Sequence, residues 1–189
     1  MADVSSRTVL GICGPPGCGK STLAARLAGL TGAVVVPMDG FHLPNDELAR
    51  RGLSSVKGAP ETFDVEGYVA LLARLRSDDT VLAPSFDRDA EETVPDSIEI
   101  LATHQLVITE GNYLLLDVPG WRDVRPLLDE CWYVDADDDL RRERLIARHV
   151  AHGRTRADAT AWVLRSDEAN ARLIATTRDR ADLVVGLGP

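Results

Sequence analysis

A segment near the N-terminus has the residue types and spacing of a loop that binds the phosphates of a nucleotide. Residues 14–21 read Gly-Pro-Pro-Gly-Cys-Gly-Lys-Ser and match the pattern G-x-x-x-x-G-K-S. Glycines let such a loop curl so that backbone N–H groups point at phosphate oxygens. Lys20 would reach the β- and γ-phosphates, and the hydroxyl of Ser21 would bind Mg²⁺. The residues expected to bind ATP are Gly14, Pro15, Pro16, Gly17, Cys18, Gly19, Lys20, Ser21 and Thr22.

The segments on either side of this loop have the patterns that the motif needs. Residues 8–13 form an apolar run typical of a buried strand, and residues 22–28 have the pattern of a helix. A helix that begins at the loop adds partial positive charge where the phosphates would lie. The order of strand, glycine-rich loop and helix therefore predicts a phosphate site rather than a glycine-rich turn that matches by chance.

Two carboxylates follow buried strands further along the chain. Asp39 comes after the apolar run 33–36, and Glu110 comes after the run 106–109. Parallel α/β sheets bind ligands at the carboxyl ends of their strands, so both side chains are expected to face the phosphates. Asp39 is the candidate general base and a water-mediated Mg²⁺ contact, and Glu110 is the candidate metal ligand, direct or indirect. The alternative is that a polar residue merely ends each strand.

Strand and helix patterns alternate along the whole chain. Asp64 is expected to cap a helix that follows it, and Asp137 is expected to cap another. Five strands with helices between them predict an α/β fold with an open, doubly wound, five-stranded parallel sheet and helices on both faces. The predicted strands are 8–13, 33–36, 106–109, 131–135 and 183–185. Further expected elements are a helical turn near 45–50, helices over 65–75, 138–151 and 157–176, and short strands at 81–83 and 97–100 around a charged loop at 86–92.

Length and composition limit the class of protein. The 189 residues fit a single domain, and a net charge of −9 argues against a general binder of nucleic acid or anionic membranes. No apolar run is long enough for a membrane span, and the first residues have no apolar signal core. Three scattered cysteines fit neither a disulfide framework nor a zinc site, so a cytoplasmic location is expected.

Lysine is rare in this chain, and its positions are informative. Of 21 basic residues only Lys20 and Lys57 are lysine; the rest are arginine. A compact ammonium fits between phosphates in a way that a planar guanidinium does not. Lys20 needs a compact ammonium to fit between the phosphates. The inference that Lys57 needs one as well is weaker.

Five motifs, taken in order, resemble those of the uridine kinase / phosphoribulokinase / bacterial pantothenate kinase superfamily. The likeness is greatest to a bacterial branch labelled nucleoside/nucleotide kinase-like or fructose-transport-system kinase. The resemblance implies a P-loop NTPase three-layer fold, ATP and Mg²⁺ as cofactors, an acceptor-binding insertion at about 40–104 and a helical lid at about 141–157. It also implies that Asp39 is the catalytic aspartate. The motifs are 14–21, 36–42, 57–64, 84–88 and 109–115.

An arginine-rich segment coincides with the lid that the resemblance implies. Gly153 interrupts the helical pattern there, as expected for a lid that closes over ATP and brings arginines onto the transferring phosphoryl group. Arg144 and Arg148 are the leading candidates for this role, followed by Arg154. The alternative is a solvated helix face on which Arg141 and Arg142 pair with neighbouring carboxylates.

The resemblance also points to residues that would bind the phosphate acceptor. His42 is expected either to bind a substrate hydroxyl or to cap its own loop, and Arg88 either to bind an anion or to pair with nearby carboxylates. Phe63 and Phe86 are as readily core residues as stacking surfaces. The Phe-Asp-Arg sequence at 86–88 departs from the pattern of uridine-type enzymes, which disfavours a pyrimidine nucleoside. The candidate acceptor-binding residues are Asp39, His42, Lys57, Glu61, Phe63, Phe86, Arg88 and Asn112, and adenine is expected near 178–182.

The sequence thus predicts an Mg·ATP-dependent kinase that transfers the γ-phosphoryl group to a hydroxyl of a small metabolite. A nucleoside, a sugar and a pantothenate-like alcohol all stay open as acceptors, and so does assembly into a homodimer. One alternative is a regulatory NTPase without a small-molecule acceptor. A second alternative, a nucleic-acid 5′-end kinase, is disfavoured by the charge of −9.

Overall fold

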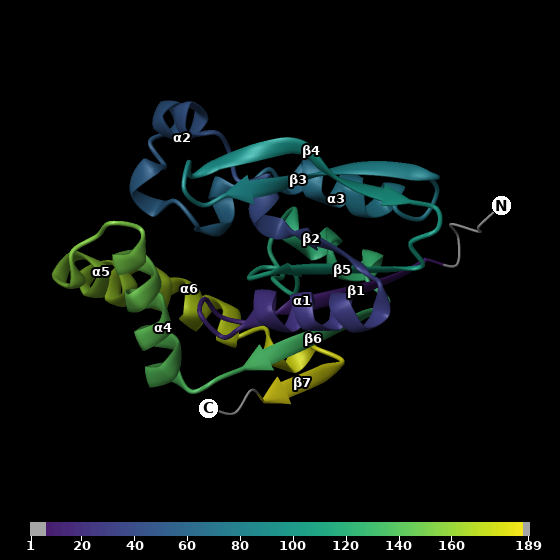
Figure 1. Ribbon diagram of the computed structural model, residues 1–189. Helices are drawn as coiled ribbons and strands as arrows, with labels where there is room; N and C mark the ends of the chain where they lie inside the picture. Colours follow the sequence, from purple (N-terminus) through teal and green to yellow (C-terminus); the bar gives the residue numbers. More distant parts are fainter. Residues whose placement is uncertain (1–6, 187–189) are drawn as a thin grey trace.

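The computed structural model describes residues 7–186, and it contains the predicted parallel sheet (Figure 1). The remaining residues of the expected 1–189 domain lie outside the described part. Five parallel strands pair in the order β2-β5-β1-β6-β7, so the α/β prediction is confirmed. The strands are β1 (Thr8–Cys13), β2 (Val34–Pro37), β5 (Leu106–Gly111), β6 (Glu130–Asp135) and β7 (Leu183–Gly186).

Apolar side chains fill both faces of this sheet and so make a three-layer fold. Helix α1 (Lys20–Thr31) covers one face, where Ala24 packs with Leu10 and Ile12 of β1. Helix α3 (Val65–Arg74) covers the other face, and Asp64 caps it by accepting a hydrogen bond from the backbone N–H of Gly67, as predicted. Helices on both faces leave only the strand ends open to a ligand.

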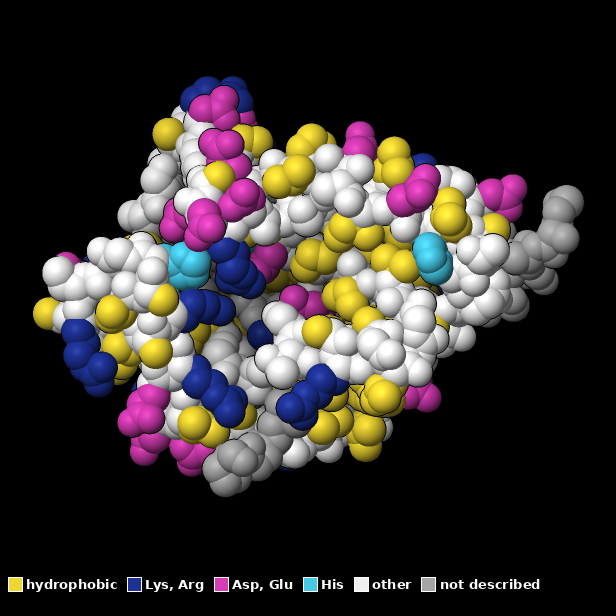
Figure 2. All heavy atoms as spheres, in the orientation of Figure 1, with side chains coloured by type: hydrophobic (Ala, Val, Ile, Leu, Met, Phe, Trp, Pro, Cys, Tyr) yellow, Lys and Arg dark blue, Asp and Glu magenta, His cyan; other side chains and the backbone are white. Residues whose placement is uncertain are grey.

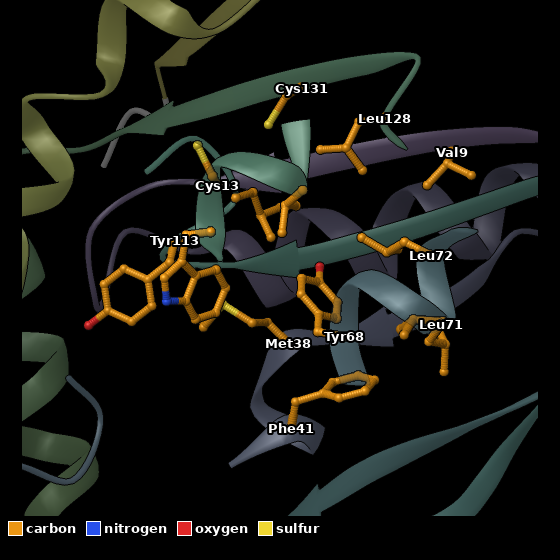
Figure 3. Close-up of a cluster of buried hydrophobic side chains, with 14 of the residues drawn as sticks. Val9, Cys13, Met38, Phe41, Tyr68, Leu71, Leu72, Tyr113, Leu128 and Cys131 are labelled. Carbon is orange, nitrogen blue, oxygen red and sulfur yellow. The ribbon is translucent and has the colours of Figure 1, made fainter. Parts of the chain in front are cut away.

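The larger core cluster, drawn in Figure 3, ties the insertion to the sheet. Tyr68 of α3 lies inside this cluster beside Phe41, with ring centroids 4.9 Å apart. Thr109 of β5 donates a hydrogen bond to the Val36 carbonyl at 2.8 Å, so the Tyr68 hydroxyl, 2.6 Å from the Thr109 hydroxyl, acts as its donor. The ends of β2 and β5, where the two candidate carboxylates lie, are thereby fixed relative to each other.

The insertion contains a helix and a hairpin. Helix α2 (Asn45–Arg51) lies where a helical turn was expected. Strands β3 (Thr80–Asp87) and β4 (Glu92–Leu101) form a separate antiparallel sheet. The predicted short strands and the loop at 86–92 were wrong in extent, because pairing resumes after an irregularity between Ala83 and Ser85. Ala83 and Ser85 pair with Ile98 and Val94, so β4 carries extra residues at this point, including Asp96 with φ of 51°. Pro84, opposite them, has no N–H to give to the ladder.

The predicted lid is a helical arm. Helix α4 (Asp138–Ala151) begins at the predicted cap, and Gly153, with φ of 92°, turns the chain into α5 (Arg156–Trp162). A π-helical segment, Val163–Asp167, joins α5 to α6 (Glu168–Ala175), so the helix predicted over 157–176 contains an extra-wide turn. Figure 1 shows α2, α4 and α5 gathered beyond the end of the sheet to which the arrows of β6 and β7 point. No helix within residues 7–186 is long and apolar enough to cross a membrane.

Candidate active site

The loop at 14–19 needs glycine because its backbone is left-handed and closely packed. Gly14 and Gly17 have φ values of 148° and 80°. A Cβ at Gly14 would lie 2.5 Å from the carbonyl oxygen of Val134, and one at Gly17 would lie 2.7 Å from that of Arg141. The loop is therefore held against β6 on one side and against the lid helix on the other. Pro15, Pro16 and Cys18 are buried within it, and burial raises the pKa of the Cys18 thiol, which lowers its reactivity.

Lys20 begins α1 and folds back over this loop. Its side chain is 8% exposed, and its Nζ donates a hydrogen bond to the carbonyl oxygen of Pro15 at 3.1 Å. An ammonium has three donors, so this bond leaves capacity for phosphate oxygens. Ser21 and Thr22 follow in the first turn of α1, where the helix N-terminus favours negative charge.

Glu110 lies at the end of β5 and bonds to the phosphate loop. The hydroxyl of Ser21 donates to Glu110 Oε1 at 2.9 Å, and Glu110 is only 7% exposed. Burial raises the pKa of Glu110, and the nearby carboxylate of Asp39 raises it further, against the lowering effects of Lys20 and Ser21. A buried carboxylate beside a second one is a site that favours a cation.

Asp39 reaches the same region from β2. It lies in the 3₁₀ turn Met38–Phe41, and Pro37 pairs with Glu110 in the register of the sheet. Arg88 Nη2 donates to Asp39 Oδ2 at 3.0 Å. The sheet thus brings Asp39 and Glu110 together, although they are far apart in sequence.

These oxygen donors fit the requirements of Mg²⁺. A hydroxyl and one or two carboxylates are hard ligands, and Mg²⁺ in kinases completes its shell with substrate phosphates and water. Ser21, Asp39 and Glu110 are the residues that would hold the ion. Within the described residues, no group of three or more His, Cys, Asp or Glu side chains could form a metal site without such help from phosphate.

His42 packs between the 3₁₀ turn Met38–Phe41 and the aromatic residues of the insertion. Its Nδ1 lies 2.8 Å from the Asp39 carbonyl oxygen, which is the contact expected of a loop cap. Its ring centroid lies 4.1 Å from that of Phe63 and 4.7 Å from that of Phe86. Burial lowers the pKa of His42, more strongly than the nearby Asp39 raises it. Phe63 belongs to the core and also contacts Tyr113.

Lys57 connects the insertion to the turn of the hairpin. Its Nζ donates to Asn45 Oδ1 at 2.9 Å and to the carbonyl of Glu91 at 2.9 Å, and it lies 5.6 Å from the Phe86 ring centroid. Glu91, in the turn, has a positive φ of 53°. The other two candidates on this side make no such network: Glu61 is exposed, and Asn112, just after β5, is half-buried.

Arg141 and Arg142 pair with carboxylates of their own helix, as the alternative predicted, but Arg141 is 1% exposed, so a solvated helix face is wrong for this residue. Arg141 lies 3.2 Å from Asp138, and Arg142 lies 2.9 Å from Asp139. Both pairs are three residues apart on one helix face. These pairs hold both guanidinium groups on α4.

Sequence reasoning missed Glu168, the first residue of α6, which binds both arginines of α4. It forms ion pairs with Arg141 and with Arg142, the second at 2.9 Å. Arg141, 1% exposed, also donates to the carbonyl of Pro16 at 3.2 Å. Glu168 thus joins α6 to α4, and Arg141 joins α4 to the phosphate loop. The available signal was a carboxylate three residues before the apolar Ala171, on the same buried face.

The other lid arginines differ in what they contact. Arg148 has an exposed side chain on α4; desolvation, and then the charge of Arg88, lower its pKa, whereas Asp167, Asp39 and Glu110 raise it. Arg144 is exposed on α4. The guanidinium of Arg154 lies 4.3 Å from the Trp162 ring centroid, in a cation–π contact within the lid.

Contacts between the lid and the insertion close the cleft on two sides. His152 Nδ1 lies 3.3 Å from Asp89 Oδ1 at the hairpin turn, and Asn170 donates to the carbonyl of Gly58 at 3.3 Å. Figure 2 shows a hollow at the centre of the molecule with Lys and Arg side chains along it and a histidine beside them. At the carboxyl end of β6, Arg178 pairs with Asp135 at 3.2 Å in the region expected for adenine, which stays a prediction.

Comparison with known proteins places these features in a family. The model of the Phosphoribulokinase / Uridine kinase family matches residues 9–189. The Escherichia coli K12 protein named Uncharacterized protein YggC is 38% identical over 95% of this chain and 77% of its own length. A Schizosaccharomyces pombe protein provisionally named as a uridine kinase is 33% identical over 95% of this chain and 83% of its own length.

A solved structure shares the fold almost throughout. A crystal structure from Silicibacter sp. TM1040, provisionally named as a fructose transport system kinase, has a TM-score of 0.90 and 41% identity. It covers 95% of this chain and 89% of its own. The chain therefore belongs to the phosphoribulokinase / uridine kinase family, and it is an ATP-dependent small-molecule kinase with a P-loop.

Proposed function

We propose that this protein transfers the γ-phosphoryl group of Mg·ATP to a hydroxyl of a small metabolite. The observation that carries the proposal is the meeting of Asp39 and Glu110 at neighbouring strand ends, with Glu110 bonded to Ser21 of the phosphate loop. Phosphoryl transfer needs groups that donate hydrogen bonds to the phosphates, a metal site and a group that orients the nucleophile. The phosphate loop would supply the first, Ser21 and Glu110 the second, and Asp39 the third.

Each residue has a role in this proposal. Backbone N–H groups of the loop and Lys20 bind the β- and γ-phosphates, and Ser21 with Glu110 holds the metal ion. Mg²⁺, when bound, neutralises charge on the β- and γ-oxygens. Asp39 accepts the hydrogen bond of the acceptor hydroxyl, and its proton leaves through Asp39 as the oxygen–phosphorus bond forms and ADP departs. Arg148 lies where it stabilises negative charge on the transferring group.

A screen of ADP release tests this proposal. Purified protein with Mg·ATP is assayed against nucleosides, sugars and pantothenate-like alcohols, and one class is expected to raise ADP release at least tenfold above the rate with no acceptor. Hydrolysis that no acceptor changes, and that a protein partner accelerates, would instead favour a regulatory NTPase. Tight oligonucleotide binding at low salt would favour a 5′-end kinase.

A further inference from the structure

Three cationic side chains converge on the acceptor side of the cleft, although the protein has a net charge of −9. They come from separate segments: Lys57 follows a short 3₁₀ turn, Arg88 lies in the hairpin turn, and Arg148 lies on α4. Figure 2 shows basic side chains gathered along the central hollow. Gathering cations in a concave site of an acidic protein focuses positive potential there.

Arg88 is held by the residue that the proposed reaction uses. Its Nη2 donates to Asp39 Oδ2 at 3.0 Å, while its side chain is 46% exposed. A guanidinium has five N–H donors in a planar fork, so this bond leaves donors for a second anion. An acceptor whose hydroxyl reaches Asp39 must therefore place its remaining atoms next to Arg88.

The neighbours of Arg88 increase the positive charge at this position. Lys57 Nζ lies 5.6 Å from the Phe86 ring centroid, and the His42 ring centroid lies 4.7 Å from the same ring, so Lys57 lies beside this pair of rings. Desolvation, and then the charge of Arg88, lower the pKa of Arg148 on α4. Lys57 and Arg88 already pair with Glu91 and Asp39, but exposed pairs of this kind exchange at little cost, so an incoming anion can share either cation.

The aromatic residues nearby do not form a vacant slot for a planar base. His42 contacts both Phe63 and Phe86, and Phe63 is 6% exposed. Their ring surfaces are already used in internal packing. The charged candidates left on this side are Lys57, Arg88 and the exposed Glu61, and of these Arg88 contacts Asp39.

We infer that the acceptor carries an anionic group, a carboxylate or a phosphate ester, that Arg88 binds while Asp39 aligns the reacting hydroxyl. The 3.0 Å contact between the two residues limits the separation of these groups, since each would bind the acceptor at hydrogen-bond distance. The anion then lies roughly two to five bonds from the hydroxyl. The acceptor is therefore a compact hydroxy acid or a short sugar phosphate. This inference rests on the proposed kinase function.

Binding of matched probes to the whole protein tests it without relying on turnover. Calorimetric titrations with Mg²⁺ and a non-hydrolysable ATP analogue compare D-glycerate with glycerol, and ribose 5-phosphate with ribose. We expect the anionic member of at least one pair to bind at least tenfold more tightly than its neutral partner. The two pairs distinguish a carboxylate from a phosphate ester.

Variants of Arg88 show whether that preference comes from the proposed contact. Arg88→Gln is expected to weaken binding of the anionic probe by about 10- to 100-fold, the loss typical of a charge-assisted hydrogen bond. Arg88→Lys should retain part of the affinity, and neither variant should change affinity for the ATP analogue more than about twofold. The matched control is Arg74→Gln. It removes an exposed arginine at the end of α3 that pairs with Asp78, and it should change the affinity for neither the anionic probe nor the ATP analogue.

The outcomes separate this inference from the proposed function. The inference would be overturned if neither anionic probe bound, or if the neutral partners bound equally well. It would also be overturned if Arg88→Gln did not weaken anion binding. Phosphorylation of a neutral alcohol faster than any anionic one would overturn it while the kinase function stands. Anion binding through Arg88 without phosphoryl transfer would support it while the kinase function fails.

Discussion

The nucleotide side and the acceptor side of the cleft are built differently. On the nucleotide side, Lys20 and Glu110 are almost fully buried, and their partners are the backbone and residues of the same loop. On the acceptor side, Lys57 and Arg88 are held by ion pairs at the surface, one of them with Glu91, which is 63% exposed. The first side is fixed by main-chain geometry and burial, whereas the second is fixed by contacts that water can replace.

This difference has a physical consequence. Every kinase with such a loop binds the same triphosphate, so a preformed, buried site lowers the cost of ordering it. Exposed ion pairs contribute at most about 1 kcal/mol, so an incoming ligand can exchange them at little cost. A few surface substitutions on the acceptor side can therefore change which acceptor binds, while the nucleotide side stays the same.

The largest effect is expected on the nucleotide side. Lys20→Ala removes the buried ammonium that would bind the transferring phosphates, and turnover should fall about a thousandfold. Steady-state ADP release measures the loss. Kinetics equal to those of the unaltered protein would contradict the assignment of the phosphate loop.

Asp39→Asn tests the residue at the boundary between the two sides. An amide aligns a hydroxyl poorly and cannot take its proton, so acceptor-dependent turnover should fall about a hundred- to a thousandfold. Affinity for the ATP analogue without Mg²⁺ should stay within about twofold, because Asp39 would meet the nucleotide only through the metal ion. If acceptor-dependent turnover persists in full, the role given to Asp39 is wrong.

Glu168→Gln tests how the lid is joined to the nucleotide side. Burial alone would raise the pKa of Glu168, but hydrogen bonds from Arg142 and Arg141 hold that pKa below its usual range. Removing the charge leaves the buried Arg141 with the largely exposed Asp138 as its remaining carboxylate partner in the described residues, which should lower the free energy of unfolding by about 3 kcal/mol. Thermal unfolding should show a Tm lower by about 6–12 °C.

The control for this variant is Glu143→Gln, an exposed carboxylate on α4, which should leave the Tm within about 1 °C of the original. Equal effects of the two variants would show that the link through Glu168 adds nothing to stability.

The pH dependence of Mg·ATP binding probes the buried carboxylate. Burial, and then Asp39, raise the pKa of Glu110, so the free protein keeps that proton to a higher pH than an ordinary glutamate would. Because the metal needs the ionised form, binding releases the proton, and affinity should weaken as pH falls below the raised pKa. Calorimetry in buffers of different ionisation enthalpy measures the release. Glu110→Gln should lack it; the same release from both proteins would exclude Glu110 as its source.

The smallest effect is expected from Lys57→Gln. Its partner Glu91 is largely exposed, so stability should change by less than about 0.5 kcal/mol and ATP affinity should be unchanged. The KM of the acceptor should rise about three- to tenfold, because one cation of the acceptor side is lost. If the KM of ATP rose instead, Lys57 would have to be assigned to the nucleotide side.

The nucleotide side could be predicted from sequence because its chemistry is local. The loop at 14–21 is contiguous, and strand periodicity together with the rule for parallel sheets places Asp39 and Glu110 at one edge. The caps at Asp64 and Asp137 were predictable for the same reason, since each side chain binds backbone within three residues.

The lid and the acceptor side were less predictable because their contacts join distant segments. Glu168 meets Arg141 across 27 residues, and Arg88 meets Asp39 across 49. A single sequence carries no signal for which of several carboxylates an arginine will bind. The extended β4 was missed because Pro84 and the charged turn hide the alternation of the hairpin.

The fate of the γ-phosphoryl group tests the central claim most directly. The protein is incubated with Mg²⁺, ATP carrying ¹⁸O in its γ-phosphoryl oxygens, and the acceptor found by the screen, and products are weighed by mass spectrometry. The account predicts a phosphoester that retains the labelled oxygens, formed in equal amount with ADP and absent in the Asp39→Asn variant. Labelled inorganic phosphate released at a rate that the acceptor does not change would contradict it.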